Sequence, residues 1–182
     1  MHSVIAAIRR WRVRLAHVVA LPAVYFARPS LSSLAAAFLI GLLGLGVRAV
    51  AAGYLEKGTS LTTAGPYAHT RNPLYFGSAI LLLSAIVAMN SWISGAVLAL
   101  YFAVVYPVVI HSEEETLRHH FGQAYDNYAR QVPAFFPQIS RAPVSGEDKS
   151  FSLQRYMANG EYRAMFGSLA SGAALMALSY FR

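Results

Sequence analysis

The sequence predicts an all-α, polytopic integral membrane protein with about five transmembrane helices and short cytoplasmic helices. Two observations predict this class. Hydrophobic residues make up 56% of the 182 residues and charged residues only 13%, about half of the roughly 25% that a soluble domain carries. The apolar residues also gather in long runs, and a helix needs about 20 mostly apolar residues to cross a bilayer. We expect residues 1–182 to form a single domain.

Five apolar segments follow one another along the chain. They lie at residues 13–27, 31–55, 73–90, 92–110 and 164–181. The first follows a basic N-terminus, as in a signal peptide, but it has no convincing cleavage site of small residues, so we interpret it as a membrane helix. Residues 28–30 join the first two helices, and residues 89–91 join the third and fourth. Connections this short join antiparallel neighbours.

The basic residues predict the orientation of these helices, because Lys and Arg concentrate on the cytoplasmic side of a membrane. If five helices span, twelve of the 15 Lys and Arg residues share one face, and the other face carries only Arg28 and Arg182. We therefore expect a cytoplasmic N-terminus, in a prokaryotic inner membrane because the chain is short. Arg48 lies inside the second helix, near its inner end, and is expected to extend its charge to the membrane surface.

The composition also excludes several kinds of partner and site. The chain has no cysteine, so disulfides, thiolate metal ligands and cysteine nucleophiles are excluded. The net charge of +7 does not indicate a nucleic-acid partner, because the basic residues flank apolar segments and form no single patch. Small residues at Gly41, Gly44 and Gly46, and at Gly167 and Gly172, predict close helix packing, not a dinucleotide-binding turn.

The first of two polar segments on the predicted cytoplasmic face covers residues 65–77. Asn72 and Pro73 are typical of the N-cap and the first residue of a helix. The free N–H groups at such a helix start attract anions, and Arg71 beside them can hold a carboxylate through two hydrogen bonds. The alternative is an ordinary capped helix start with an arginine that reaches toward the surface.

The second polar segment covers residues 111–130 and predicts two short helices, at 112–121 and 123–131. Ser112 and Glu115 fit a capping box for the first of them. The carboxylates here either bind a cationic ligand group or pair with neighbours one helical turn away. Such pairs would join Glu114 to Arg118 and Glu115 to His119. The histidines form one cluster only, so we expect no metal site.

A set of residues in and just after the two polar segments follows a characteristic order along the chain. They are Gly65, Tyr67, Arg71, Pro73, Tyr75, Gly77, Glu113, Glu114, Leu117, Phe121, Gly122, Tyr125, Tyr128, Val132, Pro133 and Pro137. In this order they resemble the isoprenylcysteine carboxyl methyltransferase family and its phospholipid methyltransferase relatives, over about residues 60–137. Asn72 stands where the family usually has His, and an amide cannot act as a base near neutral pH. The predicted fifth helix lies outside the resemblance.

The resemblance implies methyl transfer from S-adenosylmethionine to a lipid-like or isoprenoid acceptor, with a carboxylate as the expected acceptor group, at the cytoplasmic face. It implies that Arg71, Tyr75 and Glu114 are catalytic. The donor is expected to contact these three and also Tyr67, His69, Asn72, Pro73, Glu113 and Tyr125. Membrane lipids and an amphiphilic substrate are the implied partners. Phe135 and Phe136 either line the acceptor entrance or form an aromatic belt at the membrane interface.

Two other functions fit the same sequence. The first is a membrane reductase that uses a nicotinamide cofactor on a related helical scaffold, for which Arg71, Arg118 and Arg130 form only a small basic set. The second is a membrane scaffold with no enzymatic activity. A scaffold would tolerate alanine at Tyr75 and Glu114, whereas the methyltransferase would not.

Overall fold

The computed structural model describes residues 2–56, 58, 60–142 and 150–181, and for residues 2–13 only the course of the backbone. Every regular element in this part is a helix, which confirms the predicted all-α class. The elements are α1 (His2–Phe26), α2 (Leu31–Tyr54), the 3-10 helix η1 (Gly65–Ala68), α3 (Pro73–Met89), α4 (Trp92–Phe121), α5 (Gln123–Gln131), α6 (Leu153–Asn159) and α7 (Tyr162–Tyr180).

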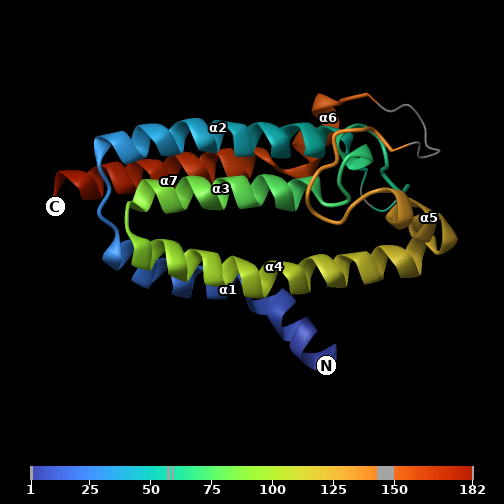
Figure 1. Cartoon of the computed structure of the whole chain (residues 1–182), viewed down its shortest axis with the longest axis horizontal. Helices are drawn as coiled ribbons and strands as arrows, with labels where there is room; N and C mark the ends of the chain where they lie inside the picture. Colours follow the sequence, from blue (N-terminus) through green and yellow to red (C-terminus); the bar gives the residue numbers. More distant parts are fainter. Residues whose placement is uncertain (1, 57, 59, 143–149, 182) are drawn as a thin grey trace.

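The long helices lie in two layers (Figure 1). Helices α2, α3 and α7 form one layer, and α1 packs along α4 in the other. The connections from α1 to α2 and from α3 to α4 lie at the end of the bundle where the chain terminates. Helices η1, α5 and α6 and their loops gather at the opposite end. The two polar segments therefore share one end of the bundle.

Local capping explains the two short connections. Ser30 and Ser33 form a capping box that starts α2, and the Ser91 hydroxyl accepts a hydrogen bond from the Ser94 amide at the start of α4. Helix α3 ends at Asn90, whose φ of 46° places it in the left-handed region that Asn tolerates better than most residues. Arg28 donates its backbone N–H to the Met89 carbonyl at 2.8 Å, which ties the two connections together.

Helix α4 is longer than expected, because the predicted division between a membrane helix at 92–110 and a second helix at 112–121 is wrong. The helix continues unbroken from Trp92 to Phe121. Ser112 is buried in its interior, so the predicted capping box does not form. No glycine occurs between residues 96 and 121 of this helix, and Gly122, with a φ of 53°, ends it. The polar end of α4 therefore extends about three turns beyond its apolar part.

Close packing of α2 against α3 depends on glycine. A Cβ on Gly44 would lie 2.9 Å from Cγ of Leu81, and one on Gly41 would lie 3.1 Å from Oγ of Ser84. These two contacts confirm the predicted packing role. No described atom lies within 4 Å of the Cβ positions of Gly46, Gly167 or Gly172. The prediction is therefore wrong for these three within the described part of the chain, and Gly167 and Gly172 of α7 are exposed.

The outer surface of the bundle is rich in exposed apolar side chains. They include Leu21, Leu31, Leu43, Trp92, Leu100, Phe166 and Tyr180. Within the described part of the chain, α2 and α4 are long and apolar enough to cross a membrane, while the apolar helical stretches Arg14–Phe26 and Pro73–Met89 are shorter. A surface this apolar is unfavourable in water and is typical of a protein that contacts lipid.

The glycine contacts give a direct test of the α2–α3 packing. Gly44→Val should destabilise the protein by about 1–3 kcal/mol, because the new side chain must displace Leu81. Gly46→Val, two residues along the same helix, faces open space and is the matched control. Thermal unfolding in detergent, followed by circular dichroism, measures both. Equal losses in the two variants would contradict the packing argument.

Candidate functional site

Backbone hydrogen bonds bring the first polar segment against the chain that follows α5. The Arg71 N–H donates to the Pro133 carbonyl at 2.9 Å, and the Gln138 N–H donates to the His69 carbonyl at 2.9 Å. Nδ1 of His69 also lies 2.9 Å from the Gln138 carbonyl oxygen. These contacts of His69 hold the loop in place, and they involve its backbone carbonyl and Nδ1.

A half-buried ion pair lies at the centre of the site. Nη2 of Arg71 lies 2.9 Å from Oε1 of Glu114, and the two side chains are 14% and 13% exposed. Asn72 donates its side-chain amide to the same Oε1 at 3.3 Å and to the Ala134 carbonyl at 2.9 Å. Arg71 also donates to the Ala129 carbonyl at 3.1 Å. Such a desolvated pair is stable only when its polar atoms have partners of this kind.

Asn72 occupies the predicted N-cap position of α3, but its side chain does not cap the helix. The amide is directed to Glu114 and Ala134 instead. The residue that stands where the resembling family has His therefore acts as a hydrogen-bond donor to the central carboxylate. Pro73 is buried as the first residue of α3, as expected.

The predicted pairings along α4 are wrong. Arg118 pairs with Asp126 at 2.9 Å, which leaves Glu114 to Arg71, and Glu115 lies 3.4 Å from His111 instead of pairing with His119. The reason is geometric. Because α4 is continuous, Glu114 faces the start of α3, while Arg118 is within reach of α5.

The two adjacent glutamates have different partners. Tyr75 donates its hydroxyl to Oε1 of Glu113 at 2.6 Å, and its ring packs edge-on against Tyr106 with the ring centres 5.6 Å apart. Neighbouring helix residues point about 100° apart. Glu113 can therefore bind Tyr75 while Glu114 binds Arg71. In the sequence, Arg71 precedes Asn72 and Tyr75 follows it.

Three buried polar atoms lack a hydrogen-bond partner within the described residues. They are the Tyr67 hydroxyl, the Tyr125 hydroxyl and Nε of Arg71. Burial raises the pKa of Tyr125 to about 12. The charge of Glu114 and, to a smaller extent, the proximity of its carboxylate to the Tyr125 hydroxyl add to this increase, while Arg71 and Arg118 oppose it. The Tyr125 hydroxyl therefore stays neutral and lies close to the Arg71–Glu114 pair. Unpartnered buried donors are costly and often mark the position of a ligand or an ordered water.

Burial also raises the pKa of Tyr67 and of Tyr128. The Tyr128 hydroxyl donates to the Tyr67 carbonyl at 2.7 Å, so it fixes η1 against α5. The charged residues that act on the Tyr67 hydroxyl differ from those that act on Tyr125. After burial, the charges of Glu161 and Glu113 contribute most to raising its pKa.

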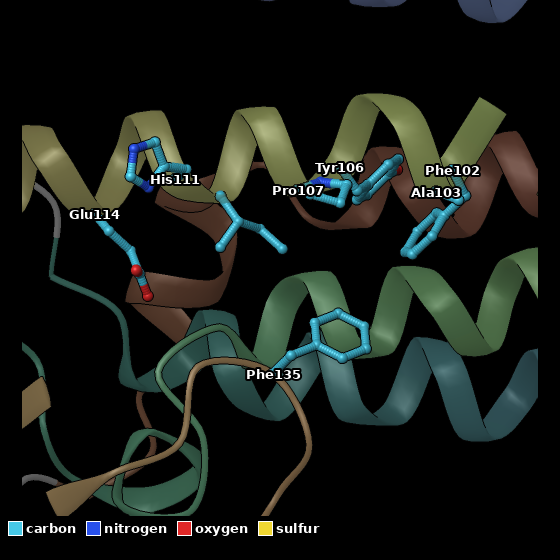
Figure 2. Close-up of a pocket in the computed structure, with 8 residues that line it drawn as sticks. Phe102, Ala103, Tyr106, Pro107, His111, Glu114 and Phe135 are labelled. Carbon is cyan, nitrogen blue, oxygen red and sulfur yellow. The ribbon is translucent and has the colours of Figure 1, made fainter. Parts of the chain in front are cut away.

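An open cavity of about 340 Å³ begins at the ion pair and follows α4 (Figure 2). Its lining is mostly apolar and consists of Phe102, Ala103, Tyr106, Pro107, Ile110, His111, Glu114 and Phe135. Glu114 and His111 lie at one end and Phe102 at the other, with Phe135 across from them on the loop. Phe135 thus lines the cavity, whereas Phe136 is exposed.

The sequence argument missed the contribution of α4 to this cavity. The signal was present as an aromatic pair one helical turn apart, Phe102 and Tyr106, whose rings stack with centres 3.9 Å apart. Among the described residues, no three His, Asp or Glu side chains converge as metal ligands would.

Comparison with known proteins adds independent information. Residues 31–124, slightly more than half of the chain, match the model of the phospholipid methyltransferase family. This range contains Arg71, Asn72, Tyr75, Glu113 and Glu114, but neither α6 nor α7. No solved structure matches the chain.

Three curated relatives are similar to parts of the chain. The nickel-cobalt-cadmium resistance protein NccN of Alcaligenes xylosoxydans xylosoxydans is 39% identical over 58% of this chain and 52% of its own length. The cobalt-zinc-cadmium resistance protein CzcN of Cupriavidus metallidurans is 38% identical over 56% of this chain and 49% of its own. The protein-S-isoprenylcysteine O-methyltransferase of Schizosaccharomyces pombe is 31% identical over 46% and 36%. The chain thus spans about half the length of the first two.

The unpartnered Tyr125 hydroxyl predicts an unusual response to mutation. Tyr125→Phe should leave the ligand-free protein as stable as the wild type or slightly more stable, because it removes a buried group that has no partner. Tyr128→Phe is the matched control and should cost about 0.5–1.5 kcal/mol, since it removes the bond to Tyr67. Thermal unfolding in detergent compares them, and a loss for Tyr125→Phe as large as for the control would contradict the assignment.

Proposed function

Because this chain belongs to the phospholipid methyltransferase family, we propose that it transfers a methyl group from S-adenosylmethionine to a lipid-like or isoprenoid acceptor at the cytoplasmic face of a membrane. The observation that carries the proposal is the half-buried Arg71–Glu114 pair, at which two buried donors, Nε of Arg71 and the Tyr125 hydroxyl, have no hydrogen-bond partner among the described residues. Similarity to a protein-S-isoprenylcysteine O-methyltransferase supports the same reaction class.

The polar atoms around the pair fit the amino-acid end of the donor, which carries a carboxylate and an ammonium group. Nε of Arg71 and the Tyr125 hydroxyl are donors suited to the carboxylate. The hydrogen bonds from Arg71 and Asn72 both go to Oε1 of Glu114, which leaves Oε2 for the ammonium. One small region can therefore bind both groups.

The junction between this polar region and the cavity suits the reacting part of the donor. When bound, the donor supplies a methyl group on a positively charged sulfur. Tyr75 binds Glu113 through its hydroxyl, and its ring packs against Tyr106 in the cavity wall; the faces of such aromatic rings attract cations. The chain contributes mainly by positioning the two reactants in line, since methyl transfer is a displacement that depends on orientation.

The apolar part of the acceptor fits the cavity along α4. A ligand pocket is typically apolar with a few polar groups that fix the orientation, and here the polar groups are at the Glu114 end. A carboxylate acceptor, the expected one, needs no base. An amine or thiol acceptor must lose a proton, and Glu113 is the carboxylate that lies beside Tyr75.

Calorimetric titration of S-adenosylmethionine and S-adenosylhomocysteine into detergent-purified protein tests the donor site. Both should bind, and Glu114→Gln should weaken binding at least tenfold, about 1.4 kcal/mol. Glu115→Gln, an exposed neighbour on the same helix, is the control and should change little. If the folded wild type binds neither compound, the proposal fails. Nicotinamide cofactors and Co²⁺ are then titrated as probes for a reductase and a metal-binding function.

Replacing Glu113 separates the possible acceptor classes. Glu113→Gln should lower the rate of methyl transfer to an amine or thiol acceptor by about 10²-fold or more, because a proton acceptor is lost. It should change the rate with a carboxylate acceptor much less. Methyl transfer from labelled donor to amphiphiles that carry each group measures this. Equal losses with all three classes would show that Glu113 binds the donor and does not accept a proton.

The proposed location is a multi-pass arrangement in a prokaryotic inner membrane, with five spanning helices and a cytoplasmic N-terminus. Alkaline phosphatase is active only outside the cytoplasm. Fusions within residues 28–30, within 89–91 and after residue 181 should therefore be active, and fusions within residues 60–72 inactive. If the C-terminal fusion is expressed but inactive, α7 does not cross the membrane.

A further inference from the structure

A second ion pair lies on the other side of α3 from Glu114, outside the proposed donor site. Arg48 of α2 donates from Nε and Nη2 to the carboxylate of Glu161, at distances of 2.7–3.0 Å. The two side chains are 20% and 13% exposed. Arg48 therefore does not extend to the surface as expected. Its charge is held inside the bundle by the residue that precedes α7.

The same guanidinium also binds the first turns of α3. Nη1 of Arg48 donates to the Leu74 carbonyl at 3.2 Å and to the Ser78 hydroxyl. Gly77 permits this approach, because a Cβ there would lie 2.6 Å from Cγ of Arg48. One side chain thus joins α2, α3 and α7, and it binds α3 at the residue between Pro73 and Tyr75.

Helix α6 fixes the position of Glu161. Asn159 donates to the carbonyls of Ala52 and Leu55 at 2.9 and 3.0 Å, and Arg155 donates to the Gly53 carbonyl at 2.8 Å. The Ala52 and Gly53 carbonyls belong to the last turn of α2, and Leu55 is its C-cap, so these groups have no intrahelical partners. Helix α6 therefore caps α2 from outside and brings Glu161 to Arg48.

The buried Tyr67 hydroxyl connects this pair with the site. It has no hydrogen-bond partner among the described residues, and the charges of Glu161 and Glu113 both act on it. The second ion pair and Glu113 of α4 thus both act on the same buried group. The start of α3 lies between them.

We infer that Arg48 and Glu161 are positioning residues, which hold the first turns of α3 so that Asn72 and Tyr75 keep their contacts with Glu114 and Glu113. The consequence for methyl transfer rests on the proposed function, whereas the positioning itself does not. Both α6 and α7 lie outside the range that matches the family. On this inference, the C-terminal segment helps to position the residues of the site.

Glu161→Gln tests the inference, with Glu56→Gln as the matched control. The control removes an ion pair between the same segment and a residue just after α2, Arg155–Glu56 at 3.2 Å, while Arg155 keeps its hydrogen bond to the Gly53 carbonyl and Glu161 keeps its pair with Arg48. Hydrogen–deuterium exchange of residues 76–80 reports on α3 directly. Exchange there should be about tenfold faster in Glu161→Gln than in the wild type or the control, while exchange in residues 23–27 should stay unchanged.

The affinity for S-adenosylhomocysteine links this change to the site. It should fall at least fivefold in Glu161→Gln, stay unchanged in Glu56→Gln and recover in part in Glu161→Asp, which keeps the charge. All are measured well below the unfolding temperature of each variant. If Glu161→Gln does not fold, Ser78→Ala, which removes one of the hydrogen bonds from Arg48 to α3, takes its place and should also show faster exchange in residues 76–80 and weaker binding of S-adenosylhomocysteine.

The outcomes separate the inference from the proposed function. Unchanged exchange in residues 76–80 overturns the positioning role, whatever the donor affinity. Faster exchange in residues 76–80 with unchanged affinity for S-adenosylhomocysteine would show that the position of α3 does not affect the donor site. A wild-type protein that does not bind S-adenosylhomocysteine overturns the proposed function, while the exchange measurement still decides whether the pair positions α3.

Discussion

A charge inside an apolar bundle must be paired, and this constraint organises the whole polar end of the molecule. Two arginines satisfy it, each by binding a glutamate from a distant part of the chain and a backbone carbonyl nearby. Arg71 joins the start of α3 to α4, and Arg48 joins the first turns of α3 to α2 and α7. Without either pair, a charge would remain desolvated at the point where the helices meet. The start of α3 is therefore the most strongly constrained position in the fold.

The continuity of α4 is the second element of the arrangement. Because the helix does not end at its last apolar turn, it carries Glu113 and Glu114 past the start of α3 on a rigid support. The loop after α5 then closes the other side, through backbone hydrogen bonds to residues 68–71. Adjacent carboxylates can thus face different partners with little freedom to exchange them.

Much of the fold was predictable because apolar length and capping are local properties. The bounds of α2, α3 and α5 follow from Ser30, Pro73 and Gly122, and the structure confirms them within one residue. Which polar side chains pair with each other was harder to predict from the sequence. Arg71 with Glu114 and Arg48 with Glu161 each join residues more than 40 positions apart, and nothing in a single sequence distinguishes such a pair from the local pair one turn away. The cavity was missed for the same reason, since α4 and Phe135 meet only in space.

The presence of Asn72 affects how the protonation state of the site depends on pH. Its amide has no titratable proton, and the neighbouring Tyr125 hydroxyl loses its proton only at about pH 12. Neither group therefore gains or loses a proton across roughly pH 6–9. A histidine at the same position would change charge inside that range. An amide in place of an imidazole ring thus keeps the charge at this position independent of the proton concentration of the compartment.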